Sequence, residues 1–145
     1  MNVRELNRDL AQVLDDAKTA VMASVDKDGK PSLRWLTPGL LPGTPGSIFF
    51  ITSPHSDKIR ELHSNPNVTW LFQTRSLNRI IRLRATVQIH ENPALTSEVL
   101  EAVSARLTTF WKINEDKHAM VVVESAITDA VVLDPAKGTS IQVAL

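Results

Sequence analysis

Cysteine and tyrosine are both absent from this chain of 145 residues. Without thiols the chain can form no disulfide, thiolate metal site or cysteine nucleophile, and it gives no sign of an oxidising compartment. Without tyrosine it has no phenolic acid for catalysis. Sixteen Lys and Arg balance sixteen Asp and Glu, so no charge excess attracts nucleic acid or an acidic membrane. Any anion site must therefore be local.

Long apolar runs and the common catalytic signatures are missing too. The opening MNVRELNRDL carries charges where a signal peptide needs an apolar stretch, and no run reaches membrane-spanning length. The chain contains no GxGxxG, GxxxxGK[ST] or GxSxG motif, and its four histidines are widely scattered. We therefore expect a cytoplasmic protein with no metal site and no contact with membrane or nucleic acid.

Residues 1–145 are expected to form one domain, which is long enough to bury a core. An apolar stripe over about 2–18 predicts a leading amphipathic helix, with Asn2 and Glu5 placed as a capping box. Further short helices are predicted in three places: one of about two turns that stops at Asn65-Pro66, one over about 93–104, and one carrying Leu107, Phe110 and Trp111.

Short apolar or alternating runs predict six or so strands. They lie at 20–25, 31–37, 47–52, 67–73, 79–90, 119–124 and 128–134. Asp26-Lys27-Asp28-Gly29 is a turn signal that joins the first two strands as a hairpin. The ordered pattern is expected to end after Asp134-Pro135, which leaves a tail after about 135. Because most strands are linked by hairpins and helices are few, we expect a mainly β protein, a small antiparallel barrel.

TSPHSDKIREL, residues 52–62, follows an apolar strand and opens a helix. One interpretation is ordinary capping by Ser56. The other is an anion site, in which the second and third strands pair and bring Arg34 near the segment from Thr52 to Lys58. Helix N–H groups, a planar guanidinium and a lysine charge together suit a phosphate monoester. The residues alone leave both interpretations open.

Three segments carry a wider resemblance: AVMASVDKDGKPSLRWLTP, SIFFITSPHSDKIRELHSNPNVTWLFQ and RIIRLRATVQI. In this order, over roughly residues 5 to 134, they resemble the pyridoxamine 5′-phosphate oxidase-like FMN-binding split-barrel family. The likeness is closest to its short general-stress-protein type. The resemblance implies a six-stranded antiparallel split barrel that forms a homodimer, with FMN held in clefts at the subunit interface. It also implies a flavin-dependent oxidoreductase that uses a small-molecule electron donor or acceptor not identified by the sequence.

The resemblance also implies which residues bind FMN. Arg34 and Lys58 would hold the phosphate together with Ser56 at the helix N-terminus. Trp111 would reach the flavin of the other subunit. The residues implied to lie along the flavin ring and its ribityl chain belong to two strand ends: Trp35, Leu36, Thr37, Ile51, Thr52 and Ser53. No residue is implied as catalytic, since the flavin carries the redox chemistry.

Departures from the family pattern narrow the expected activity. Asp57 stands where the family often has a second basic residue, and Ile80 stands where pyridoxamine phosphate oxidases carry a flavin-contacting glutamine. The final TSIQVAL does not supply their substrate-binding Arg and His. We therefore do not expect oxidation of vitamin B6. The alternatives to an FMN oxidoreductase are a non-catalytic flavin-binding stress protein and a relative that binds a deazaflavin or haem in the same barrel.

Overall fold

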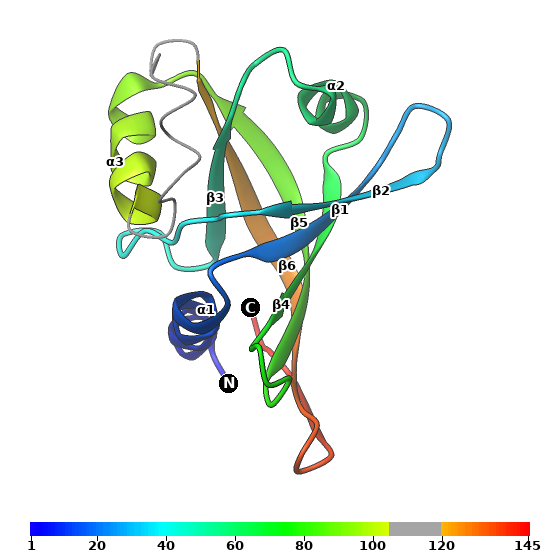
Figure 1. Ribbon diagram of the computed structural model, residues 1–145, viewed down its shortest axis with the longest axis vertical. Coiled ribbons are helices and arrows are strands. Elements are labelled where there is room, and N and C mark those ends of the chain that lie inside the picture. The colour runs from blue at the N-terminus through cyan, green and yellow to red at the C-terminus, as the bar shows by residue number, and fades with distance from the viewer. Residues whose placement is uncertain (105–119) are drawn as a thin grey trace.

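The computed structural model describes residues 1–104 and 120–145. Its strands form one 7-stranded sheet with the order β2-β1-β4-β5-β6-β3, and β7 adds to β6. The elements shown in Figure 1 are α1 (Val3–Ala17), β1 (Ala20–Val25), β2 (Pro31–Leu36), β3 (Ser47–Thr52), α2 (Asp57–Ser64), β4 (Asn67–Gln73), β5 (Ile80–His90), α3 (Pro93–Ser104), β6 (Val121–Asp134) and β7 (Thr139–Gln142). The expected mainly β, antiparallel split barrel is confirmed. The helix expected around Leu107 to Trp111 lies outside the described residues.

The barrel is split because its second and third strands do not pair with each other. β2 pairs with β1, with Arg34 opposite Met22, whereas β3 pairs with β6. The expected pairing of these two strands was therefore wrong. The contact between this hairpin and β3 comes from the segment after β2. There Gly39 and Phe49 exchange N–H···O bonds of 2.7 and 2.9 Å.

The last part of the sheet differs from the sequence prediction in two ways. The strands expected over 119–124 and 128–134 are one strand, β6, in which Thr128 is an extra residue between the pairs Arg84–Asp129 and Ala85–Ile127. This bulge lets the strand continue through a polar stretch. The expected tail is also wrong, because a turn at 135–138 leads into β7, which returns along β6.

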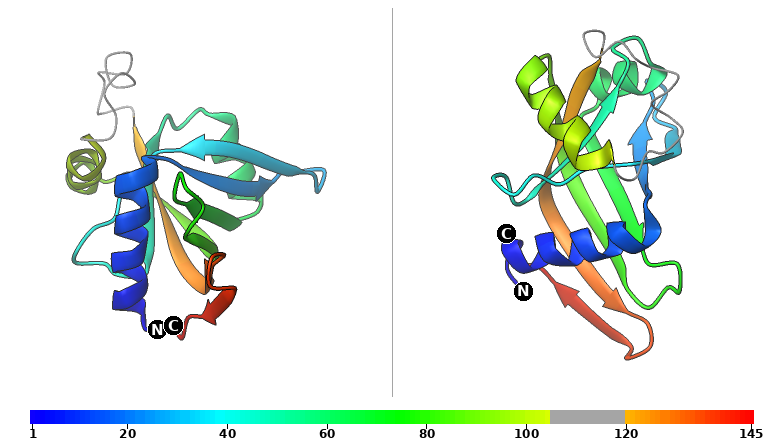
Figure 2. Two further views of the ribbon diagram at one scale, coloured as in Figure 1. Left: turned by 60° about the horizontal axis from the view of Figure 1, so that its bottom comes forward. Right: turned by 60° about the vertical axis from the view of Figure 1, so that its left-hand side comes forward.

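The barrel interior is filled by the inward faces of the strands and by one side of α1. Trp70 is fully buried and contacts the rings of Phe50 and Phe72, with centroids 6.0 and 5.7 Å away. Its indole N–H donates to Ser125 Oγ at 3.1 Å, which satisfies the buried polar group. Figure 2 shows α1 lying along one side of the barrel. No helix in residues 1–104 or 120–145 is long and apolar enough to cross a membrane.

A second apolar cluster lies where α3 packs on β3 and β6. Its buried members are Leu41, Phe49, Val99, Val103 and Val122. The two helices therefore flank β3 on different sides, with α3 on this cluster and α2 beside the β1–β2 hairpin (Figure 1). Because α2 lies beside the hairpin, its side chains can contact those of β1 and β2.

Gly39 is expected to be needed for the close approach of α3. A Cβ at this position would lie 2.8 Å from Val103 Cγ1 and 3.3 Å from Ala102 Cβ. Gly39→Ala should therefore destabilise the protein by about 1–3 kcal/mol, the usual cost of overpacking. This corresponds to a fall in melting temperature of roughly 2–4 °C per kcal/mol, measurable by calorimetry.

Gly43→Ala is the matched control, because a Cβ there meets nothing within 4 Å. Its melting temperature should equal or slightly exceed that of the wild type. Equal melting temperatures for the two variants would contradict the proposed packing of Gly39 against α3.

Candidate functional site

The helix α2 begins at Asp57, whose side chain is exposed. Ile59 and Leu62 are buried and anchor the helix to the barrel. Ser56 occupies the N-cap position, as predicted, but its side chain makes no capping hydrogen bond. Its hydroxyl instead accepts a hydrogen bond of 3.4 Å from Thr52 Oγ1. Ser56 therefore starts the helix through its backbone and keeps its hydroxyl beside Thr52.

Arg34 reaches this region from the hairpin. Asp26 Oδ1 accepts hydrogen bonds from the backbone N–H groups of Asp28 and Lys30, which fixes the turn. The register places Arg34 opposite Met22, whose side chain is buried. Since side chains alternate along a strand, Arg34 points toward the barrel side, and Trp35 points away from it and is 80% exposed.

The Arg34 guanidinium is only partly satisfied. Its Nη2 donates to Glu61 Oε2 of α2 at 2.9 Å. Its Nη1 is buried and has no hydrogen-bond partner within the described part of the chain. A buried donor without a partner costs about 1–3 kcal/mol, and more when it is charged. An anion oxygen at Nη1 would remove this cost.

Lys58 adds a second positive charge. It is half-buried at the first turn of α2, and burial together with the nearby Arg34 guanidinium lowers its pKa below the ordinary value of 10.5. The two cations are thus held close enough to repel each other. Together with the N–H groups at the start of α2, they form a concentration of positive charge that fits an anion.

Asp57 does not oppose this charge directly. Its carboxylate pairs with Arg60, one turn further along α2, and both side chains are exposed. The acidic residue found where the family often has a basic one is therefore turned toward solvent.

The predicted site residues fall into two groups. Four of them form two pairs around the start of α2: Arg34 lies close enough to Lys58 to lower its pKa, and Thr52 is hydrogen-bonded to Ser56. The others belong to neither pair: Ile51 packs against the α3 cluster, Leu36 packs against the barrel core, and Ser53 and Trp35 are exposed. Thr37 follows β2 and is half-buried. Trp111 lies outside the described residues.

Glu61, Ser24 and Ser32 are part of the site and were not predicted. Ser24 and Ser32 are opposite each other in the hairpin, and each donates to a Glu61 oxygen, at 2.7 and 3.3 Å. The signal for them was present but weak. Glu61 follows Lys58 by three residues on α2, and Ser32 precedes Arg34 by two on β2, so each shares a face with a predicted residue.

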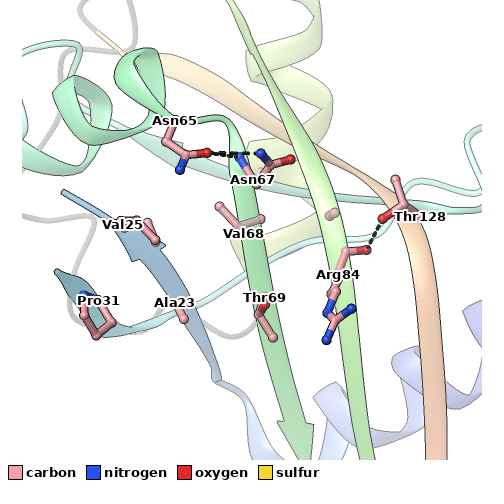
Figure 3. Close-up of a pocket in the computed structure, with 11 residues that line it drawn as sticks. Ala23, Val25, Pro31, Asn65, Asn67, Val68, Thr69, Arg84 and Thr128 are labelled. Carbon is pink, nitrogen blue, oxygen red and sulfur yellow. Dashed lines mark hydrogen bonds between the residues drawn. The ribbon is translucent and has the colours of Figure 1, made fainter. Parts of the chain in front are cut away.

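A groove of about 360 Å³ lies across β1, β4 and β5 (Figure 3), and it borders the candidate site because Ser24 is among its lining residues. Several of its polar side chains have partners: Arg84 lies 3.6 Å from Asp129, and Asn65 Oδ1 accepts two hydrogen bonds of 3.1 Å from Asn67. Neither Arg34 nor Lys58 lines this groove, so it is not assigned as the anion site.

A second polar cluster links β3, β5 and β6. Glu124 accepts a hydrogen bond of 2.7 Å from the Ser47 hydroxyl and contacts His90 Nε2 at 2.8 Å. The carboxylate stands between the hydroxyl and the imidazole, so the imidazole is not placed to activate the serine. We interpret this cluster as a structural link between strands.

Residues 6–133 match the family model described as pyridoxamine 5′-phosphate oxidase. The chain belongs to this family. A pyridoxine/pyridoxamine 5′-phosphate oxidase of Sphingopyxis alaskensis is 38% identical over 79 residues, which cover 54% of this chain and 35% of the relative. One of Gluconobacter oxydans is 40% identical over 75 residues, covering 51% and 36%. The matched part thus spans about a third of the length of these curated relatives.

Solved structures show the same fold at lower identity. A conserved hypothetical protein of Mycobacterium tuberculosis superposes with a TM-score of 0.73 and 21% identity, covering 88% of this chain and 83% of that one. An FMN binding protein of Nostoc punctiforme gives 0.70 and 15%, covering 93% and 86%. Other chains with this fold are described as an F420 reductase and as a heme binding protein of Mycobacterium smegmatis, with TM-scores of 0.65 and 0.71.

Lys58 is expected to destabilise the ligand-free fold. Lys58→Met should raise the melting temperature at neutral pH in a low-salt buffer without phosphate, because it removes a cation that burial and Arg34 disfavour. The gain should shrink as the pH rises from the lowered pKa of Lys58 toward 10.5, because there the unfolded chain binds more protons and the wild type gains stability.

Lys27→Met is the control, because Lys27 is an exposed residue of the hairpin turn. It should leave the melting temperature nearly unchanged. A Lys58→Met variant that melts at or below the wild-type temperature would show that the charge of Lys58 does not destabilise the ligand-free fold.

Proposed function

We propose that this protein is an FMN-binding homodimer that acts as a flavin-dependent oxidoreductase on a substrate other than vitamin B6. The observation that carries the proposal is the buried Nη1 of Arg34, which has no hydrogen-bond partner among residues 1–104 and 120–145 and lies next to Lys58 at the N-terminus of α2. Membership of the pyridoxamine 5′-phosphate oxidase family supports the same cofactor.

The chain's own groups fit a phosphate monoester. Arg34 Nη1 would donate to one phosphate oxygen, and Lys58 would place a charge beside another. The Ser56 hydroxyl and the first N–H groups of α2 would complete the contact. The net charge of the cluster favours the dianion, since Arg34 and Lys58 outnumber the single carboxylate of Glu61.

The flavin ring and a second subunit would cover the exposed part of β2. Trp35 and Leu33 are 80% and 72% exposed on an edge strand, where large apolar side chains invite a partner. Trp35 is one residue from Arg34, so a ligand whose phosphate sits at Arg34 would have its ring within reach of this strand. In this proposal Leu36, Thr37, Ile51, Thr52 and Ser53 line the remainder of the cofactor, and Trp111 belongs to the partner's side of the cleft.

When bound, FMN would supply the redox chemistry. The residues of the chain would bind the phosphate, orient the ring and restrict water around it. Ile80, at the start of β5, places an apolar side chain where the family resemblance implies a flavin-contacting glutamine. This replacement supports a substrate different from pyridoxamine phosphate.

Arg34→Ala and Lys58→Ala should each weaken FMN binding by about 10- to 100-fold, the range expected for a lost charged hydrogen bond. Riboflavin, which lacks the phosphate, should bind all three proteins about equally. Flavin fluorescence titration measures both affinities, and the Lys27→Ala variant controls for the loss of a distant surface charge.

Equal losses for FMN and riboflavin would place Arg34 and Lys58 away from the phosphate. The absorbance spectrum of the purified protein, with mass analysis of any released ligand, distinguishes FMN from a deazaflavin or haem. A protein that is colourless and fails to bind added FMN would refute the proposal.

Turnover separates the oxidoreductase from a flavin-binding protein without activity. We expect the FMN complex to be reduced by a nicotinamide donor under anaerobic conditions and reoxidised by an added acceptor, with both steps followed by flavin absorbance. Free FMN at the same concentration is the control. Failure to reduce the bound flavin with NADH, NADPH and reduced deazaflavin would favour a storage or stress role.

A further inference from the structure

Glu61 joins α2 to the hairpin through a hydrogen-bond cluster with Ser24, Ser32 and Arg34. Its Oε2 accepts hydrogen bonds from Ser24 Oγ at 2.7 Å and from Arg34 Nη2 at 2.9 Å. Its Oε1 accepts a longer bond of 3.3 Å from Ser32 Oγ. The side chains of Arg34 and Glu61 are only 19% and 18% exposed, so water competes little for these bonds.

The fold fixes where this carboxylate lies. Ser24 and Ser32 are directly opposite in the β1–β2 register, and Arg34 is two residues further along β2 on the same face. Glu61 approaches this face from α2, one turn after Lys58. The adjacent Leu62 is buried in the barrel, so the backbone of α2 cannot move far from the hairpin.

This hydrogen-bond cluster restrains Arg34 through one of its two terminal nitrogens and leaves the other available to a ligand. Only Nη2 is bound to Glu61, and the buried Nη1 has no partner in the described residues. Repulsion from Lys58 would otherwise favour rotamers that carry the guanidinium toward solvent. An unrestrained arginine also loses side-chain entropy when a ligand orders it. In the ligand-free protein Glu61 already orders Arg34, so this entropy is not lost again when a ligand binds.

We propose that Glu61 is a positioning residue for phosphate binding, which holds Arg34 with its Nη1 inside the site next to Lys58, where no other described residue binds that nitrogen. The inference rests on the proposed function for the identity of the ligand. If Glu61 has this role, removing an acidic residue from an anion site weakens the binding of the anion, although its negative charge repels the anion.

A purely electrostatic role gives the opposite result. Glu61 carries a negative charge close to both cations, so its removal would leave the cluster more positive and attract a phosphate more strongly. A role in stability alone gives a third result, because it would weaken FMN and riboflavin to the same extent. The three roles are therefore distinguished by direction and by ligand.

Glu61→Ala should weaken FMN binding by about 5- to 30-fold and leave riboflavin binding nearly unchanged, since it frees a partly buried arginine. Glu61→Gln should restore most of the affinity, because its amide oxygen still accepts from Arg34 and Ser24. Glu98→Ala is the matched control for loss of a glutamate, as Glu98 is exposed on α3. Flavin fluorescence titration gives these affinities.

The Arg34→Ala background tests whether Glu61 acts through Arg34. In that background Glu61→Ala should leave FMN affinity unchanged or increase it, because only its negative charge remains to be felt. A further loss of FMN affinity, as large as that in the wild type, would overturn the positioning role. So would tighter or equal FMN binding by the single variant Glu61→Ala.

The ligand-free protein provides a test that does not depend on FMN. Nitrogen-15 NMR of labelled arginine should show separate, slowly exchanging Arg34 Nη1 and Nη2 signals in the wild type, and averaged signals in Glu61→Ala. Added inorganic phosphate should shift the Nη1 signal in the wild type at lower concentration than it shifts the Arg34 signals in the variant.

The outcomes separate the two proposals. A wild type that binds phosphate but not FMN would refute the proposed cofactor and leave the role of Glu61 to the NMR measurements. Identical Arg34 signals and phosphate responses in wild type and Glu61→Ala would refute the positioning role, whether or not FMN binds.

Discussion

The repulsion between Arg34 and Lys58 is the constraint on which the site depends. The fold half-buries the Lys58 ammonium on α2 and places the Arg34 guanidinium of β2 nearby, so burial and then this neighbouring charge lower the pKa of Lys58. Such an arrangement is unfavourable unless the elements that carry it are held by other contacts. α2 is held by Ile59 and Leu62 in the barrel core, and β2 by its full register with β1.

The acidic residues near the site have different roles because they face different sides of α2. Glu61 faces the hairpin and offsets one of the two positive charges through a direct bond to Arg34. Asp57 faces solvent and pairs with Arg60. The cluster therefore keeps one net positive charge in addition to the partial charge of the helix N-terminus. If Asp57 also turned inward, the charge available for an anion would be nearly cancelled.

Local signals in the sequence predicted most elements well. β1, β3 and β4 have the predicted bounds, and α1 begins with the predicted bond from the Glu5 backbone N–H to Asn2 Oδ1, because caps, turns and alternation act within a few residues. Non-local pairing was harder to predict. The pairing of β2 with β3 was wrong, since nothing in either strand specifies its neighbour in the sheet. The continuity of β6 was missed because a bulge at Thr128 looks like an interruption in the apolar pattern.

The candidate site shows the same division. Arg34, Lys58 and Ser56 were predicted from residue type and from family resemblance; the structure places Arg34 near Lys58 and Ser56 at the N-cap of α2, and their role in binding stays a prediction. Glu61 was missed because its partners Ser24 and Arg34 are 37 and 27 residues away in the chain. The sequence therefore predicted the groups that carry positive charge, but not the carboxylate that orients one of them.

One face of β2 carries a buried hydrogen-bond donor and the other carries exposed apolar side chains. Both features limit the kind of ligand that suits the site. On the barrel side, the buried Nη1 of Arg34 has no acceptor in the part of the chain that the structure describes, and an anion would supply one. On the other side, Leu33 and Trp35 expose apolar surface on an edge strand, and a ring system or another protein surface would cover it. A free phosphate meets only the first requirement, and an uncharged aromatic compound meets only the second. A phosphorylated aromatic cofactor at a subunit interface meets both, and its binding would stabilise the ligand-free fold by relieving the charge repulsion and covering the apolar surface together.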